Sequence, residues 1–214
     1  MKALCLSASN IAHSGQSSTS LRLCQRISDL LQEHRISCDI VDLRSYALQP
    51  CIGCGGCYHS RRCIHDEAFN RIYEKIIDAD CLCIISPHYA PIPAKLCMML
   101  EKMEEITFLH WWKDSDYRSE VYHLPTAVIS HGGGAGWALS SYRAMVNDTI
   151  FNALDTIQCK VIPYDDQNPA GLTLPLLTAK DNGGIFPVQT YDWPVIDEQL
   201  RSYVARVLEY IKRH

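Results

Sequence analysis

The feature that most constrains the fold of this 214-residue chain is its alternation of short apolar runs with amphipathic helical patterns. The run CLCIIS at 81–86 has the continuous hydrophobicity of a strand buried on both faces. Five strands alternating with five helices predict an α/β fold, a doubly wound parallel sheet with helices on both faces. The expected strands are 2–8, 38–43, 81–86, 126–130 and 159–163; the expected helices are 18–34, 66–78, one after Pro93, 136–156 and a last one containing Ile196–Ile211.

Three segments do not fit this minimal pattern. They are a Cys-rich loop at 50–64, an aromatic stretch at 107–123, and a long Pro-containing segment at 164–194. We therefore predict one domain over 1–214 with an inserted loop and a long extra segment. Long segments on such a scaffold usually have a function, so the last two are candidates for a dimer arm, an active-site cover or a plain surface excursion.

Composition and charge exclude some classes of function. The net charge of −4 without a basic block argues against nucleic acid as a partner. No apolar run reaches the length of a membrane span. The start, MKALCLSASN, is typical of a first strand and not of a signal peptide, so we expect a cytoplasmic protein.

Four of the eleven cysteines lie within thirteen residues, in the pattern C-x2-C-x2-C-x5-C. In a reducing compartment, clustered cysteines indicate metal or redox chemistry more often than structural disulfides. The spacing suits an iron–sulfur cluster, while a zinc site and a C-x-x-C thiol redox site are alternatives. Arg61 and Arg62 are placed to offset negative charge. The four candidate ligands are Cys51, Cys54, Cys57 and Cys63; most of the other cysteines are expected to be small core residues.

Loops that follow strands one, three and four emerge together at the carboxyl edge of a parallel sheet, where ligands bind. The first is rich in hydroxyl residues and runs into a helix N-terminus, which suits a terminal phosphate; taken alone, it is more typical of a solvated loop with an ordinary Ser N-cap. It contains neither a dinucleotide nor a triphosphate motif. The second offers His88 and Tyr89 as a planar wall, and the third offers glycines that admit a flat ligand. The phosphate candidates are Ser7, Ser9, Ser17, Ser18, Thr19 and Ser20.

Together, the stretches SASN…SSTS, PCIGCGGC…C and ADCLCIISPHY…AKL resemble the flavodoxin-like FMN proteins, and among them the iron–sulfur flavoproteins and the NADPH-dependent FMN reductases. The resemblance covers roughly the first 160 residues. It implies a flavodoxin-like fold of five parallel strands and FMN with its phosphate on the Ser/Thr loop. It also implies a [4Fe–4S] cluster on the four cysteines, paired with flavin across a subunit interface of a homo-oligomer. The flavin ring would rest on Pro87, His88, Tyr89, Ala90 and Ile92, and on His131, Gly132, Gly133, Gly134 and Trp137.

The sequence departs from the pattern of these relatives in two places. Ser18 stands before Thr19 where the family usually has a basic residue and an Asn, although His13 is nearby, and His88 stands where a small apolar residue is common. Both departures concern the contacts to phosphate and ring.

The function predicted from the sequence is that of an FMN-containing redox protein that exchanges electrons between FMN and a [4Fe–4S] cluster. The enzyme class implied is a flavin-dependent oxidoreductase of the NADPH-dependent FMN reductase type. The first alternative is an NAD(P)H-dependent FMN or quinone reductase without a cluster, and the second is a non-enzymatic electron carrier. Electron partners would be NAD(P)H, ferredoxin or a quinone, and no side chain is expected to act as a catalytic acid or base.

Overall fold

The structure is a computed structural model that describes residues 1–10, 18–89, 91–133, 136–184 and 187–213. Its main sheet is parallel, with the strand order β2-β1-β3-β4-β5, which is the flavodoxin-like order. The sequence prediction of a doubly wound parallel sheet is confirmed. The strands are β1 Lys2–Ser7, β2 Ser37–Asp42, β3 Cys81–Pro87, β4 Pro125–His131 and β5 Lys160–Val161.

The edge position beside β4 is shared by two short strands. β5 pairs with the first two residues of β4, and β6 (Leu172–Leu174) pairs with its last three, both in parallel. The strand predicted at 159–163 is therefore shorter than expected, and residues 162–171 leave the sheet before the chain returns as β6. This return brings part of the 164–194 segment to the carboxyl edge of β4.

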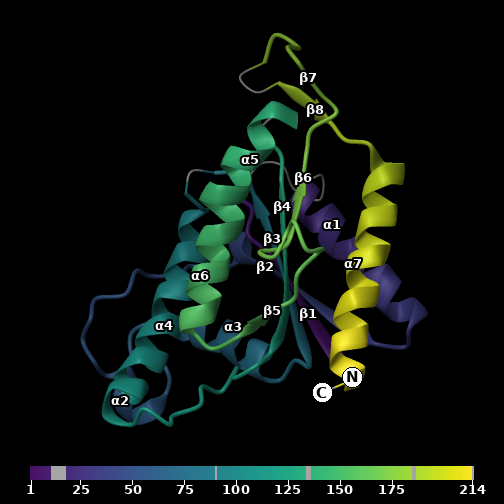
Figure 1. Ribbon diagram of the computed structural model, residues 1–214. Coiled ribbons are helices and arrows are strands. Elements are labelled where there is room, and N and C mark those ends of the chain that lie inside the picture. Colours follow the sequence, from purple (N-terminus) through teal and green to yellow (C-terminus); the bar gives the residue numbers. More distant parts are fainter. Residues whose placement is uncertain (11–17, 90, 134–135, 185–186, 214) are drawn as a thin grey trace.

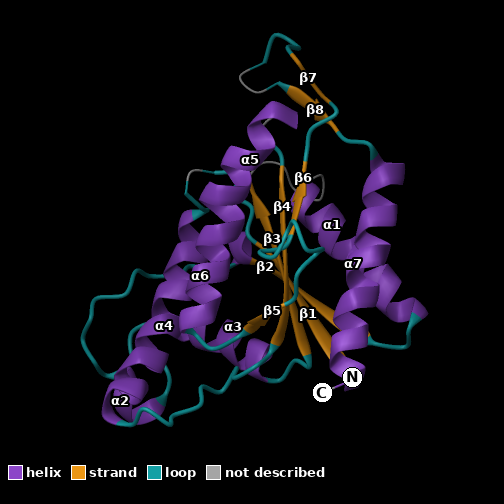
Figure 2. Ribbon diagram, in the orientation of Figure 1, coloured by secondary structure: helices purple, strands orange, loops and turns teal. Residues whose placement is uncertain are grey.

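Helices cover both faces of the sheet (Figures 1 and 2). Alternate residues of β1 enter the two cores, with Leu4 and Leu6 on one side and Ala3 and Cys5 on the other. The first core lies under α3 (Glu67–Ile77), α4 (Ala94–Lys113) and α6 (Asp148–Thr156); the second lies under α1 (Thr19–Glu33) and α7 (Trp193–Arg213).

The helix predicted over 136–156 is observed in pieces. A 3₁₀ turn at Gly136–Ala138 and the short α5 (Leu139–Tyr142) lead into a π-helical turn at Arg143–Asn147 and then α6. Asn147 explains the irregularity, because its buried side chain donates to the carbonyls of Ala170 and Leu172 beside β4. Such π turns are frequent at functional sites.

The aromatic stretch at 107–123 and the long segment at 164–194, which do not fit the minimal strand–helix pattern, also contain regular structure. Residues 107–113 continue α4, so the aromatic stretch is partly its C-terminal end. In the long segment, β7 (Thr178–Lys180) and β8 (Val188–Thr190) pair antiparallel and project beyond the carboxyl edge of the sheet (Figure 1).

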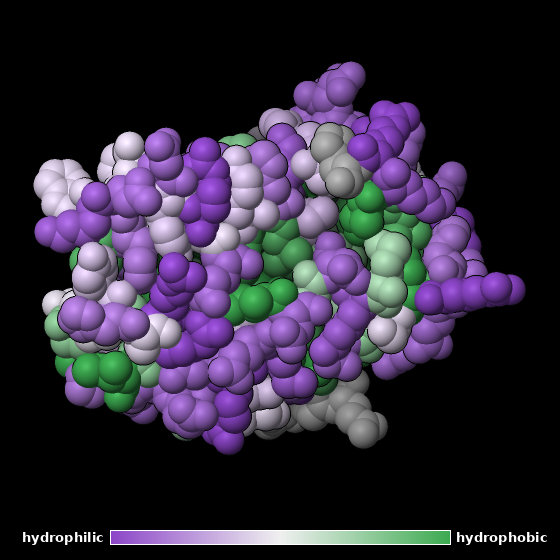
Figure 3. Space-filling model, turned by 90° about the horizontal axis from the view of Figure 1, so that it is seen from below, coloured by the Kyte–Doolittle hydropathy of each residue, from purple (hydrophilic) through white to green (hydrophobic). Residues whose placement is uncertain are grey.

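Figure 3 shows the opposite end, which is largely hydrophilic with separate apolar patches. None of the helices within the described residues is long and apolar enough to cross a membrane.

A buried ion pair fixes the base of the Cys-rich loop. Lys102 of α4 lies 3.1 Å from the Asp66 carboxylate, and both side chains are 2% exposed. Asp66 also caps α3 by accepting from the Phe69 amide, and it accepts from the Gln49 amide at 2.8 Å. Lys102 in turn donates to the Gln49 carbonyl. Although burial opposes ionisation, the Gln49 and Phe69 amides and the Lys102 ammonium lower the pKa of Asp66.

Replacing Asp66 by Ala removes the helix cap and leaves the Lys102 ammonium buried without its partner. We expect the free energy of unfolding to fall by about 3–5 kcal/mol, measured by urea denaturation at neutral pH. The matched control is Glu33→Gln, which breaks the exposed pair with Arg201 and is expected to cost less than about 1 kcal/mol. A loss for Asp66→Ala no larger than the control's would show that the buried pair contributes no more than a surface one.

Candidate functional site

The carboxyl ends of β1, β3 and β4 meet at one edge of the sheet, here called the rim. Ser7 ends β1, Pro87 ends β3, and His131 ends β4, with Pro87 and His131 paired in register. β1 lies between β2 and β3, so the chain changes direction across the sheet at this point. The rim is therefore the switch point at which doubly wound sheets bind ligands.

The hydroxyl groups of Ser7 and Ser18 lie where β1 passes to α1. The Ser7 side chain is fully buried, and its Oγ has no hydrogen-bond partner among the described residues. Ser18 occupies the N-cap position of α1, yet its side chain makes no capping hydrogen bond. The first amides of α1 thus receive no capping bond from the Ser18 side chain, and the helix dipole favours an anion there. These features fit a terminal phosphate.

A buried hydrogen-bonded chain supports the first turn of α1 from inside. His131 Nε2 lies 2.7 Å from the Ser20 hydroxyl, and His131 Nδ1 lies 3.2 Å from the Tyr191 hydroxyl. The Thr19 hydroxyl also hydrogen-bonds with Tyr191. Ser20 is 1% exposed, so its side chain holds the turn in place instead of facing solvent. Tyr191 comes from the long 164–194 segment, which therefore contributes to this part of the rim.

A second cluster closes around the loop after β4. The His88 ring stacks on Tyr142 with centroids 4.4 Å apart, and its nitrogens reach the Gly132 carbonyl and the Ser130 hydroxyl. Gly133 has a φ of +74°, and a Cβ there would lie 2.8 Å from both His88 and Tyr142. The glycine is therefore required by protein side chains that pack against it.

Both rim histidines are neutral at physiological pH. Burial lowers the pKa of His88 to about 4, against the opposing effect of the Gly132 carbonyl. Burial lowers the pKa of His131 to about 3, and the neighbouring His88 acts in the same direction. Neither ring can serve as a charged partner for phosphate, so the site depends on hydroxyls, amides and the helix dipole.

The structure places most of the predicted site residues at the rim. Ser7, Ser9, Ser18, Thr19 and Ser20 lie at or near the start of α1, as their positions in the chain require. Tyr89 is 38% exposed whereas His88 is buried, so Tyr89 is the more open of the two predicted wall residues. Ile92 is half-buried and packs against the first core. Trp137 lies in the 3₁₀ turn; its side chain, together with Ser17, Ala90 and Gly134, lies outside the described residues.

The four cysteines lie away from the rim, although their loop follows β2, whose carboxyl end is at this edge of the sheet. After β2 the chain follows the length of α4 from its first turn toward its C-terminal end. Lys95 of α4 contacts the carbonyls of residues 43, 44 and 46, and Lys102 contacts the carbonyl of Gln49. Near the end of α4, His110 stacks on Tyr58. The cysteine cavity adjoins Lys102 and Ile106, roughly 12–18 Å along α4 from its first residue at the rate of helical rise.

All four cysteines line one cavity. It is partly open to solvent and also touches Lys102 and Glu105. Cys57 is buried, Cys54 is exposed, and Cys51 and Cys63 are intermediate. Burial and the Glu105 carboxylate raise the pKa of Cys57 to about 11, so this thiol is protonated. Among the residues described, no three His, Cys, Asp or Glu side chains are arranged to hold a metal ion.

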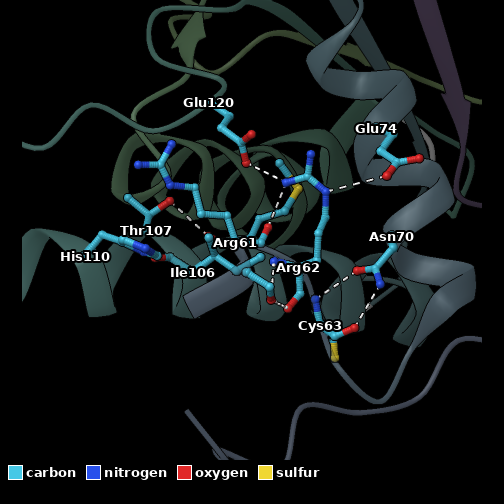
Figure 4. Close-up of polar contacts among 11 residues, drawn as sticks. Arg61, Arg62, Cys63, Asn70, Glu74, Ile106, Thr107, His110 and Glu120 are labelled. Atoms are coloured by element: carbon cyan, nitrogen blue, oxygen red, sulfur yellow. Dashed lines mark hydrogen bonds and ion pairs between the residues drawn. The ribbon is translucent and has the colours of Figure 1, made fainter. Parts of the chain in front are cut away.

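Polar contacts make the cysteine loop rigid (Figure 4). Asn70 of α3 binds both the amide and the carbonyl of Cys63, at 2.9 and 2.8 Å. Arg62 lies 2.7 Å from Glu120 and 3.7 Å from Glu74. The Arg61 guanidinium lies over the Tyr117 ring. Arg62, which was expected to offset charge on the cysteines, is thus already paired with carboxylates.

Comparison with known proteins identifies the family. Residues 1–159 match the NADPH-dependent FMN reductases. The chain belongs to this family. Its members are flavin-dependent oxidoreductases, so FMN and a nicotinamide or acceptor partner are the cofactor and partner that the family supports. The matched residues include all the strands from β1 to β4 and the whole cysteine loop, and they end before β6 and the hairpin β7–β8.

Solved structures resemble the chain at low sequence identity. RosB with a bound 8-demethyl-8-formylriboflavin-5′-phosphate intermediate is 18% identical, with a TM-score of 0.66, covering 100% of this chain and 79% of that one. FerB, an NAD(P)H:acceptor oxidoreductase from Paracoccus denitrificans, is 12% identical, with a TM-score of 0.60 and coverage of 100% and 97%. Oxidised flavodoxin 1 from Bacillus cereus is 10% identical, with a TM-score of 0.53 and coverage of 98% of each chain.

These likenesses establish the flavodoxin-like fold. No curated protein sequence matches the chain. The family match supports the FMN reductase alternative better than the cluster-containing reading, and the [4Fe–4S] cluster stays a prediction.

Sequence reasoning missed two aromatic residues that shape the rim, Tyr142 and Tyr191. Tyr142 lies in a segment predicted as plain helix, and its hydroxyl donates to the Gly133 carbonyl at 3.0 Å. Tyr191 follows a strand of only three residues. Neither tyrosine lies in a local sequence pattern that would reveal its role, because each contacts residues more than eight positions away along the chain.

Replacing Tyr191 by Phe keeps the ring but removes the hydroxyl that holds His131 and Thr19. We expect FMN affinity to fall about five- to tenfold, the equivalent of one hydrogen bond, while affinity for riboflavin, which lacks the phosphate, changes less than twofold. Flavin fluorescence quenching measures both. Tyr122→Phe, at an exposed tyrosine in the turn after α4, is the control and should change neither. Equal losses for FMN and riboflavin would place Tyr191 away from the phosphate end.

Proposed function

We propose that this protein is an NAD(P)H-dependent oxidoreductase that binds FMN at the rim, with the phosphate at the first turn of α1. The observation that carries the proposal is the buried Ser7 hydroxyl without a partner, beside an α1 N-terminus whose Ser18 side chain makes no cap. A buried polar atom without a partner is costly, and a phosphate oxygen is the acceptor that such a group and the free amides of α1 would share.

The residues of this chain would bind and orient the cofactor, which supplies the redox chemistry when bound. Ser7, Ser18 and the amides of α1 would hold the phosphate, while His131 and Tyr191 keep the first turn in position. The loops at 87–89 and 131–133 would flank the ring. His88 and Tyr142 stack on each other beside this site, and with both histidines neutral, proton exchange with the ring would pass through solvent.

The test is to add FMN to purified protein and follow binding and NADPH oxidation. We expect one FMN per chain and FMN-dependent oxidation of NADPH or NADH, with a quinone or free flavin as acceptor. Ser7→Ala combined with Ser18→Ala should weaken FMN binding at least tenfold. Ser140→Ala, at an exposed serine of α5, is the control. A wild-type protein that binds no FMN would refute the proposal; one that binds FMN but oxidises no nicotinamide would be an electron carrier.

A second candidate function adds a [4Fe–4S] cluster on Cys51, Cys54, Cys57 and Cys63. The observation that favours it is the convergence of all four side chains on one cavity held by a rigid loop. A cubane is larger than a single ion, so its four thiolates stand further apart than the ligands of one metal. Among the described residues no three His, Cys, Asp or Glu side chains are arranged to hold a metal ion, so the four thiols would have to move to bind a cluster. The high pKa of Cys57 means that binding must release protons.

Iron and sulfide assays on anaerobically purified protein test this candidate. We expect about four of each per chain, as a cubane requires. Cys54→Ser with Cys57→Ser should abolish the iron and leave FMN binding unchanged. Cys97→Ser, at an exposed cysteine of α4 outside the cavity, should retain the iron. Iron-free wild-type protein with full FMN-dependent NADPH oxidation would assign the molecule to the reductase alternative.

A further inference from the structure

A second group of thiols lies on the other face of the sheet, under α1. Cys5 of β1 is fully buried, and its register partner on β3 is Cys83. Cys24 of α1 is also fully buried, and its thiol hydrogen-bonds with Cys5. Cys38 of β2 completes the group and is the only one of these four that is partly exposed. In the sequence, none of these four residues carries a signal beyond that of a small core residue.

Cys38 and Cys5 are in direct contact. Their sulfur atoms are 3.5 Å apart, with Cys38 on β2 and Cys5 on the neighbouring β1. β2 is the edge strand of the sheet and pairs on one side only. Cys38 stands opposite Ala3 in the register of the two strands, so its contact with Cys5 is diagonal, and β2 must move for this contact to shorten to the roughly 2.05 Å of a disulfide bond.

We propose that Cys38 and Cys5 form an oxidation site for small hydroperoxides, in which Cys38 is the reacting thiol and Cys5 the resolving one. The Cys38 thiolate attacks the peroxide oxygen, the O–O bond breaks, and the leaving oxygen takes a proton to give water or an alcohol. Cys38 becomes a sulfenic acid. The Cys5 sulfur then attacks the Cys38 sulfur, the S–O bond breaks, and the hydroxyl leaves as water with the proton of Cys5. In all, two thiols and one hydroperoxide give one disulfide, one alcohol or water, and one water.

Local environment assigns the two roles. Hydrogen bonding with the Cys5 thiol and with the Ser28 hydroxyl of α1 lowers the pKa of Cys38 despite its partial burial. Neighbouring thiols and full burial raise the pKa of Cys5, so that it remains protonated. The thiolate is the form that reacts with peroxide. Partial exposure admits a small oxidant to Cys38, while Cys5 is reached only through it.

This site is independent of the four cysteines at 51–63. Those line a cavity against α4, under the first core, whereas Cys5 and Cys38 pack in or against the second. The proposal also does not depend on bound FMN, so it can be tested whether or not the protein proves to be a reductase.

Tryptic digestion separates the two residues cleanly. Cys5 lies in the peptide 3–22, Cys38 lies in 36–44, and neither peptide contains another cysteine. The full-length protein is treated with equimolar hydrogen peroxide, free thiols are blocked with N-ethylmaleimide, and the digest is analysed by mass spectrometry without reduction. We expect a 3–22/36–44 disulfide that forms with peroxide and disappears with dithiothreitol.

Variants assign the steps. In Cys5→Ser, the linked peptide should be absent and Cys38 should accumulate as a sulfenic acid that dimedone traps. In Cys38→Ser, Cys5 should remain fully reduced. The control Cys97→Ser removes an exposed thiol on α4 and should leave the disulfide unchanged; Cys5→Ala replaces Cys5→Ser if the latter does not fold. Cys38 that stays reduced while Cys54 or Cys97 is oxidised, or a linked peptide that forms only in urea, would overturn the proposal.

Discussion

The buried pair of Lys102 and Asp66 is the interaction on which the unusual part of this fold depends. It joins α4 to the start of α3 and, through Gln49, to the residue before the cysteine loop. Both ends of that loop are therefore fixed to the same charged centre. Without it, a segment rich in glycine and arginine would have little apolar surface to bury, and the cost of ordering its backbone would not be met. The four-cysteine cavity is thus a consequence of two charges inside the core.

The rim is organised by a different principle, in which neutral polar groups hold one another. His131 joins the start of α1 to Tyr191, and His88 joins β4 to Tyr142. Every ring nitrogen of the two histidines has a partner, which agrees with their lowered pKa values. Among the described residues of the rim, the buried Ser7 hydroxyl has no partner. A buried hydroxyl of this kind at the carboxyl end of β1 is placed to bind a polar group of a ligand.

Sequence patterns predicted the layered fold because the central strands β1, β3 and β4 are buried on both faces. Each is a continuous apolar run that can be recognised in the sequence without knowing which residues pack against it. β3, for example, is a run of seven residues, six of them fully buried. The same reasoning could not find β6, β7 or β8, which have three residues each and no usable periodicity. Nor could it place the cysteines, since their position depends on Lys102, far away in the chain. In the candidate site, the many hydroxyl residues of the first loop indicated a phosphate. The sequence could not show that His131 and Tyr191 already hydrogen-bond with the hydroxyls of Ser20 and Thr19.

The position of the cysteine cavity relates two predictions made from the sequence, the [4Fe–4S] cluster and the homo-oligomer. A cluster there would lie roughly 12–18 Å down α4 from the rim of the same chain, and protein side chains fill the space between. Exchange of electrons with FMN would then be served best by the rim of a second subunit placed against the cysteine loop. The C-terminal end of α4 carries exposed aromatic side chains, Trp111 and Trp112 among them, beside the loop that contains Tyr58. If the cysteines hold a cluster, we propose that a second subunit whose rim lies against the cysteine loop would bring FMN closer to the cluster than the rim of the same chain does.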